Sequence, residues 1–471
     1  NISMTSYVLK DLDNSTQKAL DNITVKAPTF NELINAIKEF EIRDNINPVY
    51  LDLYKYFLSD EEYKSKLEKV VSGLSYTNQV EKVEKEKIQQ LYENKNLSVS
   101  KLEKYAGCPF SYFIQYGLKA QERKEYSFTA PDLGSFVHNI LDIFSKSLNK
   151  DKLNWHEINE DYIRGKVSII VDEMVSKIPG FILNSSERYK YLAYRLKKML
   201  ISAINIISMQ IKQGNFEPVD YEVSFRKNGK YPPIKLTLNN GEEITLVGQI
   251  DRIDELEKDD SKYIRIVDYK SGDKSINLTE VYYGLQLQLL VYLDAIIESD
   301  KYKKSTLKPA AILYNRIDNP IVKSNEDQKD SIINEEILKK LRMNGLVLKD
   351  KDIIGEMDLS LKEGDRKTSL VIPANFDKNG NIGRYTKGVT DEEFDILREY
   401  VKYEVKELCE RMIGGDISII PCKNKNGTSC DFCSYGSICQ FDVSIKGNTY
   451  TVLNDKSDEE VIKLMEKEVK K

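Results

Sequence analysis

Two aspartates and a lysine lie on two successive strand-like runs of this chain. The first run, residues 244–253, carries Asp251; the second, residues 263–269, carries Asp268 and is followed directly by Lys270. Side chains alternate between the two faces of a strand, so Asp268 and Lys270 point to the same side. If the two runs pair as a hairpin, Asp251 lies beside Asp268 and Lys270.

The chemistry of this trio is that of a divalent metal site. Carboxylate oxygens suit Mg²⁺ or Mn²⁺, which keep coordination positions open for water and phosphate oxygens. Such a metal lowers the pKa of a bound water and stabilises charge on phosphorus, while Lys270 could orient that water or neutralise the transition state. The charged segment 254–262 is predicted to be the hairpin loop, with Asp254 nearest the turn. A D-x-K pattern by itself is most often ordinary surface charge.

Two further elements could contribute to such a site. A helix-like run at about residues 278–298 carries Gln288 and Tyr292 on one face, one turn apart. An earlier amphipathic helix carries His138, one of two histidines in the chain. A lone histidine beside apolar neighbours is more often packed in a core than bound to a metal, and His156 is predicted to lie at the surface.

Cysteines form a second pattern. Cys430, Cys433 and Cys439 share a short, turn-rich segment. Because no export signal is visible at the N-terminus, metal binding is a better interpretation of the cysteines than disulfides. Cys422 could close a local four-cysteine zinc site, whereas Cys409 lies in a predicted helix and is expected to be buried.

Taken in order, these elements resemble the PD-(D/E)xK nuclease domain of the RecB-like family. The stretches GQIDRID, IVDYKSG and LQLQLLVYL carry the resemblance. With the cysteines, the chain most resembles the C-terminal nuclease region of AddB-type subunits of bacterial ATP-dependent helicase–nuclease complexes (AddAB or RexAB), over about residues 97–441. The family's motifs fall on Gly134 and His138, on Asp251, on Asp268 and Lys270, and on Gln288 and Tyr292.

The resemblance implies an α/β fold with a restriction-endonuclease-like PD-(D/E)xK core, in which a mixed sheet is flanked by helices. It implies that Mg²⁺ or Mn²⁺ is held by His138, Asp251 and Asp268. Lys270 would assist, and Gln288 and Tyr292 would position the lysine, the substrate or the metal-site waters.

The resemblance also implies one [4Fe–4S] cluster, bound by Cys108, Cys430, Cys433 and Cys439. Cys108 and Cys430 are 322 residues apart (430 − 108). A bond between positions so distant would staple the domain, and would stabilise it by ~5 kcal/mol in a loop-closure model.

The function implied is that of a metal-dependent deoxyribonuclease, a 5′–3′ exonuclease acting on a single strand or a duplex end. Its partner would be an AddA-like helicase–nuclease subunit, in a heterodimer that resects double-strand breaks for recombinational repair in the bacterial cytoplasm. The alternative is a DNA-binding or assembly scaffold with a vestigial nuclease site, and a structural zinc protein comes third.

Composition bounds these interpretations. The chain has 471 residues, a net charge of −5 and 41% hydrophobic residues, which predicts two or three globular domains. No apolar run approaches the ~20 residues of a membrane helix, and no GxxxxGK[ST] motif is present, so no ATP motor is expected. We predict a helical segment at 1–97, the nuclease domain at 98–446 and a C-terminal tail at 447–471, and we expect residues 321–388 to be an irregular insertion.

Because the net charge is negative, DNA contact requires a local basic patch. A long helix predicted at residues 186–213 interleaves tyrosines with bases, as on a track for single-stranded DNA. A solvated cationic face on a core helix is an equally good interpretation. The candidate DNA-binding residues are Arg188, Lys190, Arg195 and Lys198.

Overall fold

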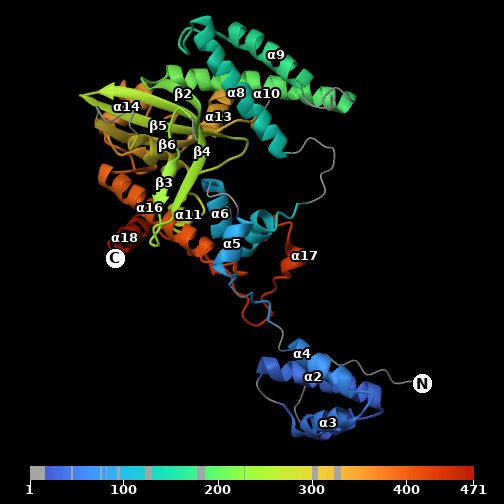
Figure 1. Cartoon of the computed structure of the whole chain (residues 1–471). Coiled ribbons are helices and arrows are strands. Elements are labelled where there is room, and N and C mark those ends of the chain that lie inside the picture. The colour runs from blue at the N-terminus through green and yellow to red at the C-terminus, as the bar shows by residue number, and fades with distance from the viewer. Residues whose placement is uncertain are drawn as a thin grey trace. The chain divides into compact units, whose positions relative to one another are not determined.

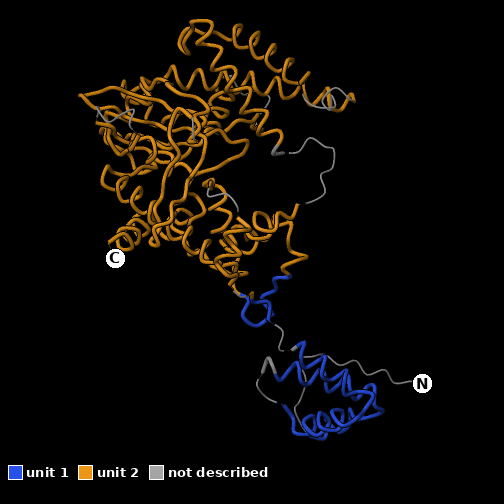
Figure 2. Tube along the Cα trace, viewed as in Figure 1, with its two compact units in different colours: residues 1–79, 440–448 blue, residues 80–439, 449–471 orange. Residues whose placement is uncertain are grey.

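The computed structural model describes most of the chain, and it divides into two compact units (Figure 2). One unit comprises residues 1–79 and 440–448, and the other residues 80–439 and 449–471. The described residues are 16–43, 46–74, 77–80, 82–92, 96–121, 130–177, 186–226, 229–299, 306–322 and 330–470. In this part of the chain, no helix is both long and apolar enough to cross a membrane.

The small unit is helical, as predicted for the N-terminal segment. Its core gathers aromatic and aliphatic side chains, with the Phe30 and Phe57 rings 5.1 Å apart and nearly perpendicular. Asn47 begins the third helix, since its side chain accepts a hydrogen bond from the Val49 backbone N–H at 3.1 Å. The helices are α1 (Thr16–Asp21), α2 (Lys26–Arg43), α3 (Pro48–Ser59) and α4 (Lys64–Leu74).

The large unit is built on an eight-stranded sheet. Six strands follow the order β1-β4-β5-β6-β7-β8, and β2 and β3 both pair with β4. The pairs β1–β4, β5–β6 and β7–β8 are parallel and the others antiparallel, so the predicted mixed sheet is confirmed. The strands are β1 (Asn96–Ser98), β2 (Glu217–Phe225), β3 (Ile234–Thr237), β4 (Glu243–Lys258), β5 (Ser261–Lys270), β6 (Thr306–Arg316), β7 (Asn344–Leu348) and β8 (Gly388–Val389).

Helices cover the sheet (Figure 1). α8, α9 and α10 lie together at one end of it, and α16 and α18 lie near the other. The long helices are α8 (Ala130–Asp151), α9 (Glu160–Lys177), α10 (Glu187–Lys212), α13 (Asp330–Leu341), α16 (Asp391–Ile413) and α18 (Asp458–Val469). The shorter ones are α5 (Lys85–Leu91), α6 (Val99–Gly107), α7 (Pro109–Tyr112), the π-helical turn η2 (Phe113–Gly117), α11 (Leu278–Tyr282), α12 (Gln288–Ile297), α14 (Lys351–Met357), α15 (Leu359–Lys362) and α17 (Gly436–Cys439).

The central hairpin is longer than predicted. β4 and β5 stay paired up to Lys258 and Ser261, and Asp259 and Asp260 form the turn with positive φ angles of 51° and 57°. The prediction that residues 254–262 form a loop is therefore wrong. Asp254 is instead fully buried in mid-strand, where it forms ion pairs with Arg252 and Arg265.

Two other predictions need correction. The helix predicted at residues 278–298 is interrupted between α11 and α12, where Gly284 has a φ of +75° and a Cβ would lie 3.0 Å from Leu408. Residues 321–388 are not an irregular insertion, because they contribute the sheet strands β7 and β8 and the helices α13, α14 and α15. Backbone pairing with β6 stabilises β7. The many charged residues of this segment do not predict that pairing.

The predicted boundaries after residues 97 and 446 differ from the limits of the large unit in the structure. Residues 80–97 belong to that unit, since β1 pairs with β4 and Ile88 of α5 is buried. Residues 449–471 also belong to it, because α18 packs on α16 and α11 and buries Val461, Ile462 and Met465. A second, three-stranded sheet has the order β10-β9-β11, with β9 (Cys422–Asn424), β10 (Gly427–Thr428) and β11 (Thr451–Val452).

Candidate metal centre and cysteine site

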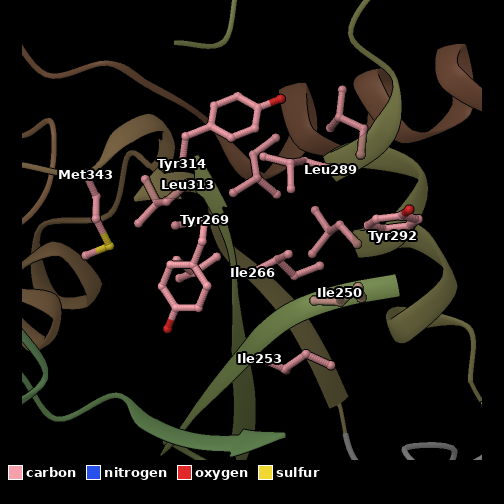
Figure 3. Close-up of a cluster of buried hydrophobic side chains, with 14 of the residues drawn as sticks. Ile250, Ile253, Ile266, Tyr269, Leu289, Tyr292, Leu313, Tyr314 and Met343 are labelled. Carbon is pink, nitrogen blue, oxygen red and sulfur yellow. The ribbon is translucent and has the colours of Figure 1, made fainter. Parts of the chain in front are cut away.

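The candidate metal centre lies on strands that a hydrophobic core holds in place. Figure 3 shows apolar side chains of β4 and β5, among them Ile250 and Ile266, near Leu289 and Tyr292 of α12. All four are at most 5% exposed. This packing fixes the backbone from which the polar side chains of the site project.

Three side chains from three elements meet at the site. His138 of α8 places its Nδ1 atom 3.3 Å from Asp251 Oδ1 on β4 and 3.7 Å from Glu222 Oε1 on β2. These residues offer ligand atoms that all lie within 4.8 Å of one another. The spacing suits the oxygen and imidazole ligands of one divalent cation.

Glu222 is the member of this group that sequence reasoning misses. Its neighbours Tyr221 and Val223 pair with Arg252 and Ile250, which sets Glu222 opposite Asp251 across the β2–β4 ladder. Its φ is +47°, a conformation that is rare for residues with a side chain and that clusters at functional sites. The signal available in the sequence is an acidic residue in the strand-like run next to the one that carries Asp251.

Asp268 and Lys270 form the adjoining part of the site. Lys270 Nζ lies 2.5 Å from Asp268 Oδ2, and Gln288 Nε2 donates to Asp268 Oδ1 at 3.4 Å. Asp251 is fixed from β5, because its Oδ2 accepts a hydrogen bond from the Tyr269 backbone N–H at 2.6 Å. The structure thus brings together the predicted residues Asp251, Asp268, Lys270 and Gln288. The compact group around His138, however, contains Glu222 in the place predicted for Asp268.

The charges of the site make it attractive to cations. Burial raises the pKa of Asp268 to about 6, and the Asp251 charge adds to that effect, while Lys270 opposes it. Burial also raises the pKa of Glu222. Burial alone would lower the pKa of His138, but the carboxylates of Asp251 and Glu222 raise it to about 10. This cluster therefore favours a positive charge at its centre, which a proton on His138 or a bound divalent cation would supply.

Tyr292 contacts both the strand β4 and the Gln288 side chain, to which its hydroxyl is hydrogen-bonded. Its buried hydroxyl accepts a hydrogen bond from the Gln249 backbone N–H at 3.3 Å, two residues before Asp251. Its ring fills the space beside Gly248, where a Cβ would lie 2.4 Å from the ring. Burial raises the pKa of Tyr292 to about 12, so the hydroxyl stays protonated.

The four cysteines expected to act together are brought into one region. Cys108 lies between α6 and α7, and Ser111 Oγ of α7 is 3.6 Å from Cys433 Sγ. Burial raises the pKa of Cys430 to about 11, and the thiols of Cys108, Cys439 and Cys433 all add to that effect because they lie nearby. The segment around Cys430 therefore folds back onto Cys108.

The remaining cysteines are Cys409 and Cys422, and the second histidine is His156. Cys409 is fully buried in α16, as predicted. Cys422 on β9 donates its thiol to the Ala106 carbonyl at 3.4 Å, and burial raises its pKa to about 11. The Cys108 charge adds to this pKa shift, so the Cys108 and Cys422 thiols lie near each other. His156 is a partly exposed residue whose Nε2 lies 2.8 Å from Glu217 Oε1.

The basic helix predicted at residues 186–213 is α10. Tyr191 and Tyr194 are 62% and 52% exposed, and their rings stack 6.5 Å apart. Lys198 lies over the Tyr194 ring at 4.8 Å, whereas Lys190 is paired with Glu187 at 2.7 Å. Across the described ranges, Arg188 and Arg195 form no ion pair, so their charges are available to a ligand.

Comparison with known proteins places the fold in a family. Residues 96–440 match the model of the PD-(D/E)XK nuclease superfamily, and the chain belongs to this superfamily. Residues 15–73 match the fifth domain of the ATP-dependent helicase/deoxyribonuclease AddB. The resemblance inferred from the sequence is therefore confirmed.

Curated relatives give the same result. Over 473 aligned residues the chain is 61% identical to the B subunit of the ATP-dependent helicase/deoxyribonuclease of Clostridioides difficile, covering 100% of the chain and 41% of the relative. The B subunits of the same enzyme from Caldanaerobacter subterraneus and Thermoanaerobacter sp. are 51% and 48% identical, over 99% and 97% of the chain and 40% of each relative. The chain spans about two fifths of the length of these relatives.

Proposed function

We propose that this chain is the nuclease region of an AddB-type helicase–deoxyribonuclease subunit and that it hydrolyses DNA phosphodiester bonds with Mg²⁺ or Mn²⁺. The observation that carries this proposal is the compact group of His138, Glu222 and Asp251 beside the Asp268–Lys270 pair. The donor set fits a hard divalent cation, since it supplies carboxylate oxygens and one imidazole nitrogen. Such an ion activates water and stabilises charge on the scissile phosphate when bound.

The chain's own residues have distinct roles in this proposal. Asp251, with His138, Glu222 and Asp268 around it, holds the ion. The Lys270 ammonium, held 2.5 Å from Asp268 Oδ2, donates to the attacking water or to a phosphate oxygen. Gln288 keeps Asp268 in place, because its amide donates to the other oxygen of that carboxylate.

DNA would approach along the exposed face of α10. Tyr191 and Tyr194 offer ring faces on which unpaired bases can stack, and the charges of Arg188, Arg195 and Lys198 can follow the phosphates. We infer that Lys190 contributes less than these three, since Glu187 already neutralises it.

The relatives' name motivates the biological setting of the proposal. We infer a heterodimer with an AddA-like helicase–nuclease subunit in the bacterial cytoplasm. In this complex the chain would act as a 5′–3′ exonuclease, and its substrate would be single-stranded DNA or the 5′-ended strand at a duplex end. That activity would resect double-strand breaks for recombinational repair.

We also propose that Cys108, Cys430, Cys433 and Cys439 bind one [4Fe–4S] cluster. A tetrahedral zinc ion would hold its thiolates about 3.8 Å apart. Within the described parts of the chain, no three thiols lie within 4.8 Å of one another. A wider grouping suits a cluster of several atoms better than a single ion. The Cys108 charge acts on the Cys430 thiol together with those of Cys433 and Cys439, which supports Cys108 over Cys422 as the fourth ligand.

A cleavage assay with anaerobically purified protein tests the nuclease proposal. Single-stranded and duplex DNA, labelled at either the 5′ or the 3′ end, would be digested with and without Mg²⁺. We expect metal-dependent cutting that Asp251→Asn or Asp268→Asn lowers about 10³-fold, since each change removes a charge beside the metal. Asp259→Asn is the matched control, because Asp259 lies in the exposed turn of the same hairpin with a φ that Asn tolerates.

The two alternatives predict different results in this assay. If the chain is a scaffold with a vestigial site, both the wild type and Asp268→Asn would bind DNA and neither would cut it. A structural zinc protein would contain zinc in place of about four irons per chain and would not cut. Cutting by Asp268→Asn at the wild-type rate would remove Asp268 from the mechanism.

A further inference from the structure

The helix that carries Gln288 and Tyr292 is capped by a residue from far away in the sequence. The first N–H groups of a helix have no partner within it, and Leu287, which precedes α12, supplies no side-chain acceptor. Glu103 of α6 fills this role, since its Oε1 accepts from the backbone N–H of Leu287 at 2.8 Å and of Gln288 at 3.0 Å. A carboxylate at this end also complements the helix dipole.

The capped turn is the one that contacts the metal centre. Gln288 is the first residue of α12, and its side chain reaches Asp268 at 3.4 Å. One turn later, Tyr292 holds the backbone of β4 next to Asp251. A shift at the start of α12 would therefore move groups that touch both strands of the site.

The surroundings of Glu103 tie it to the lysine side of the site. Burial raises the pKa of Glu103, and the two backbone hydrogen bonds and the charges of Lys274 and Lys270 oppose that effect. Lys270 and Lys274 lie over the Tyr314 ring at 5.9 and 4.9 Å. Glu103 is thus a second carboxylate near Lys270, besides Asp268.

We propose that Glu103 is a positioning residue of the metal centre, which holds the first turn of α12 so that Gln288 meets Asp268. It acts through Gln288 and touches no reacting group. The inference rests on the proposed nuclease function, because its effect on turnover presupposes that Asp268 takes part in cutting. It also makes α6, which ends directly before Cys108, part of the support of the metal centre.

Steady-state cleavage by three variants tests the effect on turnover. Glu103→Ala removes both hydrogen bonds, and we expect kcat to fall about 10- to 100-fold with little change in KM, as for other residues that orient a metal site. Glu103→Gln keeps an acceptor oxygen and should recover most of the rate. Asp350→Ala is the control, since Asp350 caps α14 through two backbone bonds of 2.8 and 3.0 Å and is not part of the site.

A double variant tests whether Glu103 acts through Gln288. In a Gln288→Ala background, Glu103→Ala should lower kcat little further, because the group that it positions is already gone. Equal losses in both backgrounds, or an equal loss in Asp350→Ala, would overturn the proposal. If Glu103→Ala does not fold, Glu103→Asp replaces it, since its carboxylate is one methylene shorter.

Hydrogen exchange at the amides of Leu287 and Gln288 provides a measurement that does not depend on cutting. Glu103→Ala should speed their exchange, whereas Asp350→Ala should not. Unchanged exchange in Glu103→Ala would refute the cap. A wild-type chain with protected amides but no cleavage would instead refute the proposed function and leave the cap standing.

Discussion

The metal centre draws its side chains from paired strands and from helices packed on them, whereas the cysteine site joins one helix junction to a short loop segment. Asp251 and Asp268 are 6% and 3% exposed. In contrast, α17, which ends at Cys439, has no buried residue, and Phe432 between two of the cysteines is 99% exposed. The two sites therefore differ in what holds them in shape.

We infer that the fold forms the metal centre before any ion binds, whereas the cysteine site needs its bound cluster to keep its shape. Backbone and side-chain hydrogen bonds and apolar packing within the protein orient Asp251 and Asp268. Ordering the segment of residues 430–439 costs conformational entropy that little apolar burial offsets. Thiolate bonds to a bound cluster would offset it, so loss of the ligands should damage activity in one site and folding in the other.

A large effect on activity without an effect on folding is expected from Glu222→Gln. The change keeps the shape of the side chain but removes one of the charges around His138, and DNA cleavage should fall about 10²- to 10³-fold. Stability should stay the same or rise, because burial and the Asp251 charge disfavour the Glu222 carboxylate more than its contact with His138 favours it. Cleavage rates at several Mg²⁺ concentrations, with a melting curve, would check this. A large loss of stability with Glu222→Gln would contradict a preformed site.

The reverse pattern is expected at the cysteine site. Cys433→Ser should lower the free energy of unfolding by about 3 to 5 kcal/mol and release the iron, because it opens a staple that spans a long stretch of the chain. Denaturant unfolding and iron content under anaerobic conditions measure both effects.

Two substitutions make this test specific. Cys108→Ser should behave like Cys433→Ser, although Cys108 is remote in sequence. Cys422→Ala should keep the iron, since Cys422 is predicted not to bind the cluster. Loss of the metal in Cys422→Ala, with retention in Cys108→Ser, would favour the local zinc site instead.

A smaller effect is expected on α10, which belongs to neither site. Tyr191→Ala and Tyr194→Ala should each weaken single-stranded DNA binding by about 1 to 3 kcal/mol through loss of base stacking. Arg195→Ala should reduce the salt dependence of binding, whereas Lys190→Ala, already paired with Glu187, should change it less. Fluorescence anisotropy at several salt concentrations would distinguish them. Unchanged binding by both tyrosine variants, with equal effects of Arg195→Ala and Lys190→Ala, would indicate a general cationic surface.

The sequence predicts those parts of the metal centre that depend only on residue type and on the alternation of side chains along one strand. The strands around Asp251 and Asp268 and the mixed sheet follow from alternation and residue type, although the motif roles require a family resemblance. Glu222 escapes such reasoning, because its place opposite Asp251 depends on the pairing of β2 with β4 and on a positive φ. Pairing between distant strands is not encoded in any short window.

Buried charge explains another failure. The sequence suggests a loop at Asp254 because that residue begins a charged run, yet Arg252 and Arg265 neutralise it inside the sheet. A buried ion pair needs both partners in place, and the partner on β5 is known only from the register of the hairpin. The proximity of Cys108 to Cys430, likewise, is predicted only by the resemblance, since no local pattern connects positions so far apart.

The smallest effect is expected from Tyr292→Phe. The hydroxyl of Tyr292 accepts from the Gln249 N–H and is hydrogen-bonded to the Gln288 side chain, and its loss should lower the free energy of unfolding by about 1 to 2 kcal/mol. The Phe ring would still fill the space beside Gly248, so β4 should keep its place and cleavage should stay within about threefold of the wild type. Chemical denaturation and steady-state cleavage of the same preparation would separate the two effects.

Tyr292→Phe also tests the contrast between the sites most directly. If the strands and the apolar core are what form the metal centre, removing the hydrogen bonds of this hydroxyl should reduce stability and not turnover. A fall in turnover of the size expected for Glu222→Gln, with stability unchanged, would mean that the hydroxyl acts on the substrate or on the metal-site waters. In that case the centre would depend, as the cysteine site does, on a bound group to complete its geometry.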